Sequence, residues 1–197
     1  MRYGLGGLVL AGLLASASPS AMGAQASPLV VEVRGGASTS VAHFRSGTRI
    51  GEGAGSGASF GVDFILSGAG RRSTYVGFSQ HRFGCVNAGC ASGHQFVATG
   101  FDGGFRFGLC TRCLVSPWLR LGALTTRVES GGLPGSPAGV SRLAFGGEAG
   151  FGVYIGARSA VALNPGLRFA AVNTRLPGGA LLRMRYAVLD IGLALSF

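Results

Sequence analysis

The sequence predicts an all-β fold: an eight-stranded antiparallel up-and-down transmembrane β-barrel preceded by a cleaved signal peptide. Three observations predict it. The mean hydropathy is high, +0.42, yet only 12% of the 197 residues are charged, far fewer than on a usual soluble surface. After residue 26 no apolar run approaches the ~18–20 residues that a spanning helix needs. The 37 glycines disfavour long helices, so apolar residues are expected to alternate with small or polar ones along strands.

The first 26 residues have the pattern of an export signal. Arg2 supplies the positive charge, residues 5–14 form an apolar stretch too short to span a bilayer, and residues 24–26 (Ala-Gln-Ala) form a cleavage site. We therefore expect residues 1–26 to be a signal peptide and residues 27–197 to form the outer-membrane β-barrel. An uncleaved membrane anchor is the alternative, and the shortness of the apolar stretch disfavours it.

Each predicted strand has one apolar face and one face of small or polar residues, because alternate side chains of a strand point to opposite sides. The contrast is clearest in the last strand, where Leu189 and Ile191 alternate with Asp190 and Gly192. It is weakest in the third strand. The eight predicted strands lie near residues 28–38, 57–67, 73–83, 95–108, 115–127, 143–156, 160–172 and 184–197.

The predicted connections alternate in length. The long ones are residues 45–56, 84–94, 129–142 and 173–183, and the short ones are residues 68–72, 109–114 and 157–159. Long extracellular loops and short periplasmic turns are typical of barrels in the bacterial outer membrane. An even number of strands then puts both termini in the periplasm.

Most of the acidic residues lie on the small, polar strand faces, together with four arginines. A charge that faces lipid at the bilayer midplane costs up to roughly 2–4 kcal/mol for Arg and less for Asp or Glu, so this face is expected to line the lumen. Side chains fill the interior of an eight-stranded barrel, and opposite charges there can pair through charge-assisted hydrogen bonds. The predicted lumen ion-pair network comprises Glu32, Arg34, Asp63, Asp102, Arg106, Arg120, Glu148, Arg168 and Asp190.

The C-terminal segment resembles the assembly signal of outer-membrane barrels, a terminal aromatic residue preceded by alternating apolar residues. The matching residues are Leu189, Ile191, Leu193, Leu195 and Phe197. In pattern and length the mature chain resembles the small eight-stranded OmpA/OmpX-type barrels of Gram-negative bacteria. This resemblance implies insertion by the barrel-assembly machinery and contact with outer-membrane lipid. We expect a monomer with a non-catalytic structural or surface-interaction role.

The four cysteines fall in two different connections, Cys85 and Cys90 in a long one and Cys110 and Cys113 in a short one. In a barrel at least ~25 Å tall these connections lie at opposite ends. The Cα atoms of a disulfide lie within about 7 Å, so the predicted disulfides are Cys85–Cys90 and Cys110–Cys113. A four-cysteine zinc site is the alternative; the same separation and export to an oxidising compartment disfavour it. No metal or other cofactor is expected.

One pair of residues raises an enzymatic alternative. Ser79 and His81 share a strand face, and some barrels of this size are lipid A deacylases that use a Ser–His pair completed by an acid. The Ser-x-His order differs from the His-x-Ser arrangement of that family, and the sequence places no acid beside the pair. No catalytic residue is therefore assigned. A lipid A-modifying enzyme, a narrow porin-like pore and a soluble lipocalin-type barrel remain the alternatives.

Most of the charged residues outside the predicted network are arginines. The chain has 17 basic residues, all arginine, against seven acids, for a net charge of +10. They are scattered singly in an exported chain, so no nucleic acid partner is expected. Guanidinium groups match phosphate geometry, and we expect those near the outer end to contact lipopolysaccharide; ordinary interfacial charge is the alternative. These residues are Arg45, Arg49, Arg82, Arg127, Arg142, Arg175, Arg183 and Arg185.

Overall fold

The computed structural model describes residues 29–46, 49–68, 71–84, 95–110, 113–130, 139–156, 160–176, 179 and 181–197. For residues 41–46, 49–54 and 130 it describes the backbone alone. The predicted signal peptide, residues 1–26, lies outside the described residues. Within the described ranges, no helix is both long and apolar enough to cross a membrane.

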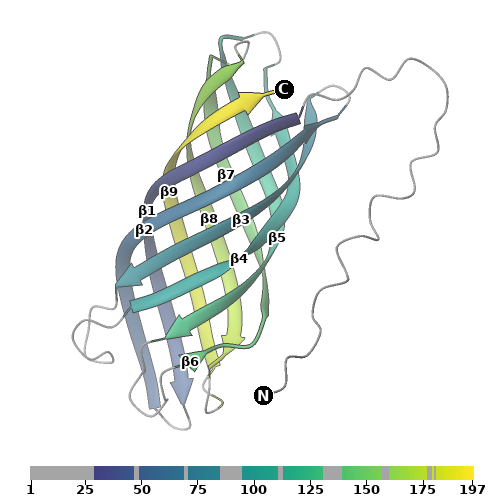
Figure 1. Ribbon diagram of the computed structural model, residues 1–197. Coiled ribbons are helices and arrows are strands. Elements are labelled where there is room, and N and C mark those ends of the chain that lie inside the picture. Colours follow the sequence, from purple (N-terminus) through teal and green to yellow (C-terminus); the bar gives the residue numbers. More distant parts are fainter. Residues whose placement is uncertain are drawn as a thin grey trace, which may run out of the picture.

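The chain forms a closed antiparallel β-barrel of eight long strands (Figure 1), as the sequence predicts. Each long strand pairs with the next one along the chain, and pairing between β1 and β9 closes the ring. A ninth element, β6, is a two-residue strand that pairs with the end of β5. The strands are β1 (Leu29–Ser46), β2 (Arg49–Ser67), β3 (Arg72–Gly84), β4 (Gln95–Gly108), β5 (Val115–Ser130), β6 (Gly139–Val140), β7 (Ala144–Ile155), β8 (Val161–Arg175) and β9 (Leu181–Ser196).

The first and last predicted long connections are wrong. Residues 45–56 belong largely to β1 and β2, which stay paired up to Ser46 and Arg49, and β8 and β9 likewise extend into residues 173–183. The glycines in this region do not interrupt β2. They fit the structure because the neighbouring strand lies too close to leave room for a side chain. A Cβ atom on Gly57 would overlap the carbonyl oxygen of Arg82.

The strands extend well beyond the membrane thickness at one end of the barrel. β1 and β2 have 18 and 19 residues, whereas a tilted strand needs about 9–11 to cross a bilayer. The extra length lies at the end that carries the β1–β2 hairpin, at the bottom of Figure 1. We call this the long-strand end, and the opposite end, where β1 begins and β9 ends, the short-turn end.

Large apolar side chains cover the outside of the barrel between its two ends. Phe101 and Phe145 are 60% and 72% exposed, and Leu189 and Ile191 are 64% and 63% exposed. Side chains at the alternate positions point into the lumen and are buried. A belt of exposed Phe, Leu and Ile is costly in water and stable against acyl chains, which places the lipid contact on this surface.

The lumen contains two layers of different chemistry. The ionic layer, nearer the short-turn end, consists of the nine charged residues predicted above, all of them buried. The apolar layer, nearer the long-strand end, was not predicted. Its residues are Phe83, Phe96, Ala98, Leu124, Val128, Ala144, Ala170, Val172, Leu176, Leu182, Met184, Tyr186 and Val188.

Candidate functional site

Arg120 on β5 is the centre of the ionic layer. Its Nη1 lies 3.0 Å from Asp63 Oδ2, and its Nη2 lies 2.6 Å from both Asp102 Oδ2 and Glu148 Oε1. Its guanidinium also stacks on the ring of Tyr75, 3.9 Å from the centroid. With a side chain 1% exposed, Arg120 joins carboxylates from three strands, β2, β4 and β7, across the barrel axis.

Two further arginines extend the ionic layer across the lumen. Arg34 on β1 donates from Nη2 to Asp63 Oδ1 at 2.5 Å and from Nη1 to Asp190 Oδ2 at 3.4 Å. Arg168 on β8 donates from Nε and Nη2 to the same oxygen of Asp190, at 2.8 and 2.5 Å. Asp63 and Asp190 are thus each shared by two guanidinium groups, which makes the layer one connected network rather than a set of separate pairs.

Arg106 and Glu32 form the part of the layer nearest the short-turn end. Arg106 Nη1 donates to Glu32 Oε2 at 2.9 Å and also to the hydroxyl of Tyr154, which itself donates to Glu32 Oε2. The Arg106 guanidinium lies 4.5 Å from the centroid of Trp118. All nine predicted network residues are therefore in the lumen and contact one another.

Neutral side chains that the prediction left out complete the network. Tyr75 on β3 donates to Glu148 Oε1 at 2.5 Å, and Trp118 Nε1 donates to Asn164 Oδ1 at 2.6 Å. With Tyr75, every one of the eight long strands contributes to the layer. The signal for two of these residues was present in the sequence, because Trp118 alternates in step with Arg120 and Tyr154 alternates in step with Glu148.

His81 pairs with a serine that the sequence did not single out. Its Nδ1 lies 2.9 Å from Ser59 Oγ, its cross-strand partner on β2, whereas Ser79 is the next residue on the same face of β3. The His81 ring is 3% exposed and packs against Tyr186, with centroids 5.0 Å apart. Among the described residues no carboxylate is hydrogen-bonded to His81, so the Ser–His–acid arrangement of a hydrolase is incomplete there.

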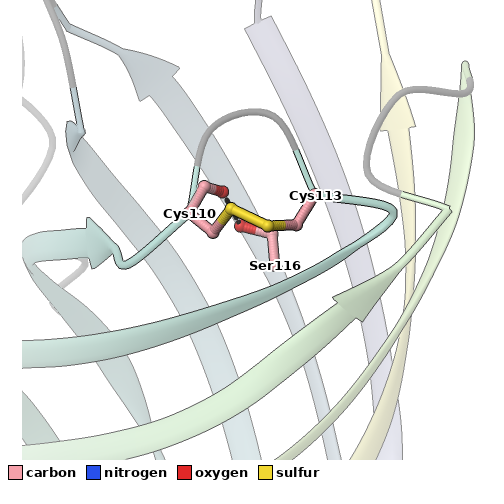
Figure 2. The surroundings of a disulfide bond; sticks show 3 residues. All are labelled: Cys110, Cys113 and Ser116. Atoms are coloured by element: carbon pink, nitrogen blue, oxygen red, sulfur yellow. Dashed lines mark hydrogen bonds between the residues drawn. A yellow bond between two sulfur atoms is a disulfide. The ribbon is translucent and has the colours of Figure 1, made fainter.

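Cys110 and Cys113 form a disulfide in the turn between β4 and β5, with Cα atoms 5.7 Å apart (Figure 2). Ser116 Oγ donates a hydrogen bond to the carbonyl oxygen of Cys110 across this turn. The other predicted pair, Cys85 and Cys90, lies outside the described residues. No three His, Cys, Asp or Glu residues in the described part of the chain are arranged to hold a metal ion.

The predicted C-terminal signal residues lie on the outer face of β9 and just beyond it. Leu189, Ile191 and Leu193 are 44–64% exposed, and Phe197 is 75% exposed. The Phe197 amide donates to the carbonyl oxygen of Leu29 at 2.9 Å, so the segment is tied to the start of β1.

The predicted outer arginines lie at the long-strand end and are exposed where their side chains are described. These are Arg82, Arg127, Arg142, Arg175, Arg183 and Arg185. The side chains of Arg45 and Arg49 lie outside the described set. Gln95, Glu129 and Asn173 are also exposed here, so the outer surface is polar at the level where the lumen is apolar.

No protein-family model matches the chain, and no curated protein matches it. Several solved structures, in contrast, are similar to the barrel. The barrel is similar to Neisserial surface protein A, with a TM-score of 0.57 and 18% identity over 85% of this chain and 97% of that one. It is also similar to the outer membrane protein OprG from Pseudomonas aeruginosa, with a TM-score of 0.55 and 12% identity over 85% and 95% of the chains.

A third similar structure is the outer membrane protein AlkL in lipid bilayers, with a TM-score of 0.52 and 9% identity over 92% of this chain and 95% of that one. At these identities the likeness concerns the fold. The chain therefore has the fold of the small eight-stranded outer-membrane β-barrels, in agreement with the prediction from its sequence.

Proposed function

We propose that this chain, which has the fold of small outer-membrane β-barrels, is a non-catalytic protein of the bacterial outer membrane with a structural or surface-interaction role and a closed lumen. The observation that carries the proposal is the filling of the lumen by two successive layers. A solute would have to break the contacts of Arg120 with three carboxylates and then displace the apolar layer around Phe83 and Leu182.

The test of a closed lumen is ion conductance of the refolded protein in a planar lipid bilayer. We expect the wild type to leave the bilayer at its baseline, because Phe83, Leu182 and Met184, each at most 1% exposed, pack together in the lumen at the level of the apolar layer. Steady channel openings that disappear on substitution of Arg120 or Glu148 would contradict the proposal and favour the narrow pore. Heat-modifiable mobility on a denaturing gel is the control that the inserted protein is a folded barrel.

We infer that the long-strand end is extracellular and that both termini of the barrel are periplasmic. The support is the change in polarity along the axis. Where the outside is a belt of Phe and Leu, the lumen is ionic; where the outside carries arginines, the lumen is apolar, as in a soluble barrel. Protease added to intact cells should cut at the long-strand end only, whereas cleavage confined to the short-turn end would reverse the orientation.

The outer arginines support contact with the phosphates of lipopolysaccharide, since a guanidinium group binds phosphate oxygens in a bidentate manner. The exposed side chains of Leu189, Ile191, Leu193 and Phe197 support recognition by the barrel-assembly machinery during insertion, and the protein is proposed to act as a monomer. The alternative of a lipid A-modifying enzyme is tested by comparing lipid A species from cells with wild-type protein and with His81→Ala. A changed lipid A profile would favour the enzyme.

A further inference from the structure

The mouth of the lumen at the short-turn end holds a cavity of about 240 Å³. Its wall includes Arg71 and Arg72 from the β2–β3 turn, Ser67 and Ser73 beside them, and Arg106 and Trp118 deeper in the barrel. Two backbone hydrogen bonds fix this turn: Gly68 N–H donates to Arg72 O at 2.9 Å, and Gly108 N–H donates to Arg71 O at 2.8 Å. The space exceeds several-fold the roughly 30 Å³ that one water occupies in the liquid.

Among the described residues, three arginines line this cavity and no carboxylate does. The nearest acid in the ionic layer, Glu32, already accepts hydrogen bonds from Arg106 Nη1 and from Tyr154. The sequence adds Arg112 and Arg158 in the other two turns of this end and places no acid in any of the three turns. The turns of this end are therefore cationic.

Arg106 has unused hydrogen-bonding capacity. Its side chain is buried, and among the described residues its Nε and Nη2 atoms have no hydrogen-bond partner. Asp63 Oδ2 lies 3.6 Å from Nη2, too far for a hydrogen bond. Both nitrogens are also closed to water, so Arg106 acts on a group in the cavity through its positive charge and not through a hydrogen bond from these atoms.

We propose that this cavity binds an oxyanion, a carboxylate or phosphate group that enters from the aqueous side of the short-turn end. The exposed guanidinium groups of Arg71 and Arg72 bind it at the rim, and the buried positive charge of Arg106 attracts it from the base. Planar guanidinium donors match the oxygen geometry of both groups, whereas a halide offers no bidentate partner. The proposal rests on the barrel geometry alone and not on the orientation or the closed lumen proposed above.

Anion binding in this cavity can be measured directly through the fluorescence of Trp118. This residue is the only tryptophan of the chain, it lines the cavity, and it stacks on Arg106. The full chain, refolded in a nonionic detergent that carries no phosphate, is titrated with inorganic phosphate or with acetate at constant ionic strength held by chloride. We expect a saturable change in Trp118 fluorescence with at least one of the two anions; the one that saturates at the lower concentration identifies the preferred group.

The double variant Arg71→Gln/Arg72→Gln tests the assignment, because both residues are exposed and their loss should not prevent folding. We expect its apparent Kd to be about tenfold higher or more, as two charge-assisted contacts are lost. The matched control, Arg127→Gln/Arg175→Gln, removes the same charge from the outer surface at the long-strand end and should titrate like the wild type. A linear response in the wild type, or an equal loss in both double variants, would overturn the proposal.

Discussion

The ionic layer and the apolar layer occupy the same lumen and are stabilised by opposite means. The ionic layer is held by charge-assisted hydrogen bonds between residues on different strands, with Arg120 contacting three carboxylates. The apolar layer is held by the packing of Phe83, Leu182 and Met184, each at most 1% exposed. The outer surface is apolar around the ionic layer and polar around the apolar layer. The chemistry of the lumen is therefore opposite to that of the outer surface at each level.

The largest expected loss in the free energy of unfolding comes from a substitution in the ionic layer. Arg120→Ala leaves Asp63, Asp102 and Glu148 buried without their shared cation, and the loss of one partner of a buried ionic network costs about 3–5 kcal/mol. The free energy of unfolding, measured by urea titration in detergent micelles with Trp118 fluorescence, should fall by that amount. Arg127→Ala, an exposed arginine of the same strand, should change it little. Equal effects of the two variants would mean that the ionic layer adds no stability.

The second prediction concerns the apolar layer. Leu182→Ala removes a fully buried side chain and leaves a cavity, which should lower the free energy of unfolding by about 3 kcal/mol. Leu163→Ala is the matched control, because Leu163 lies on the outer face, 50% exposed, where detergent or lipid fills the space. If both variants lost the same stability in the urea titration, the apolar layer would be no better packed than the lipid-facing surface.

The smallest expected effect lies outside both layers, in the β4–β5 turn. The disulfide closes a loop with a sequence separation of only three residues, so the unfolded chain loses little entropy. Replacing Cys110 and Cys113 by serine should lower the free energy of unfolding by about 2 kcal/mol at most. Ser116→Ala, which loses only the hydrogen bond to the carbonyl oxygen of Cys110, is the comparison. A loss as large as that of Arg120→Ala would show that the turn governs the stability of the whole barrel.

The sequence predicted the fold and the ionic layer because one physical constraint acts on every strand. Charges such as Asp63 and Glu148 cannot face lipid, so period-two alternation assigns them to the lumen wherever the outside is apolar. The rule applies only inside the membrane, and there the prediction is accurate.

The apolar layer was missed because that constraint ends with the membrane. At the long-strand end polar outer residues such as Arg183 and Asn173 alternate with Leu182 and Val172, which inverts the pattern used elsewhere. The glycines at residues 51, 53 and 55 were predicted to lie in a long connection, whereas they belong to β2, where a Cβ atom on Gly55 would overlap the carbonyl oxygen of Gly84. The contact between Ser59 and His81 depends on the register of two strands, which a single sequence does not reveal.

The closure of the ring between β1 and β9 sets the order in which the protein can mature. Its first and last strands are each other's neighbours, so β1 keeps one unpaired edge until β9 is in place. An intermediate that holds only the earlier strands exposes the backbone donors and acceptors of two edges, together with its oily outer surface, to the aqueous compartment. The backbone of the barrel is therefore satisfied around the whole ring only once the C-terminal strand has paired with the N-terminal one.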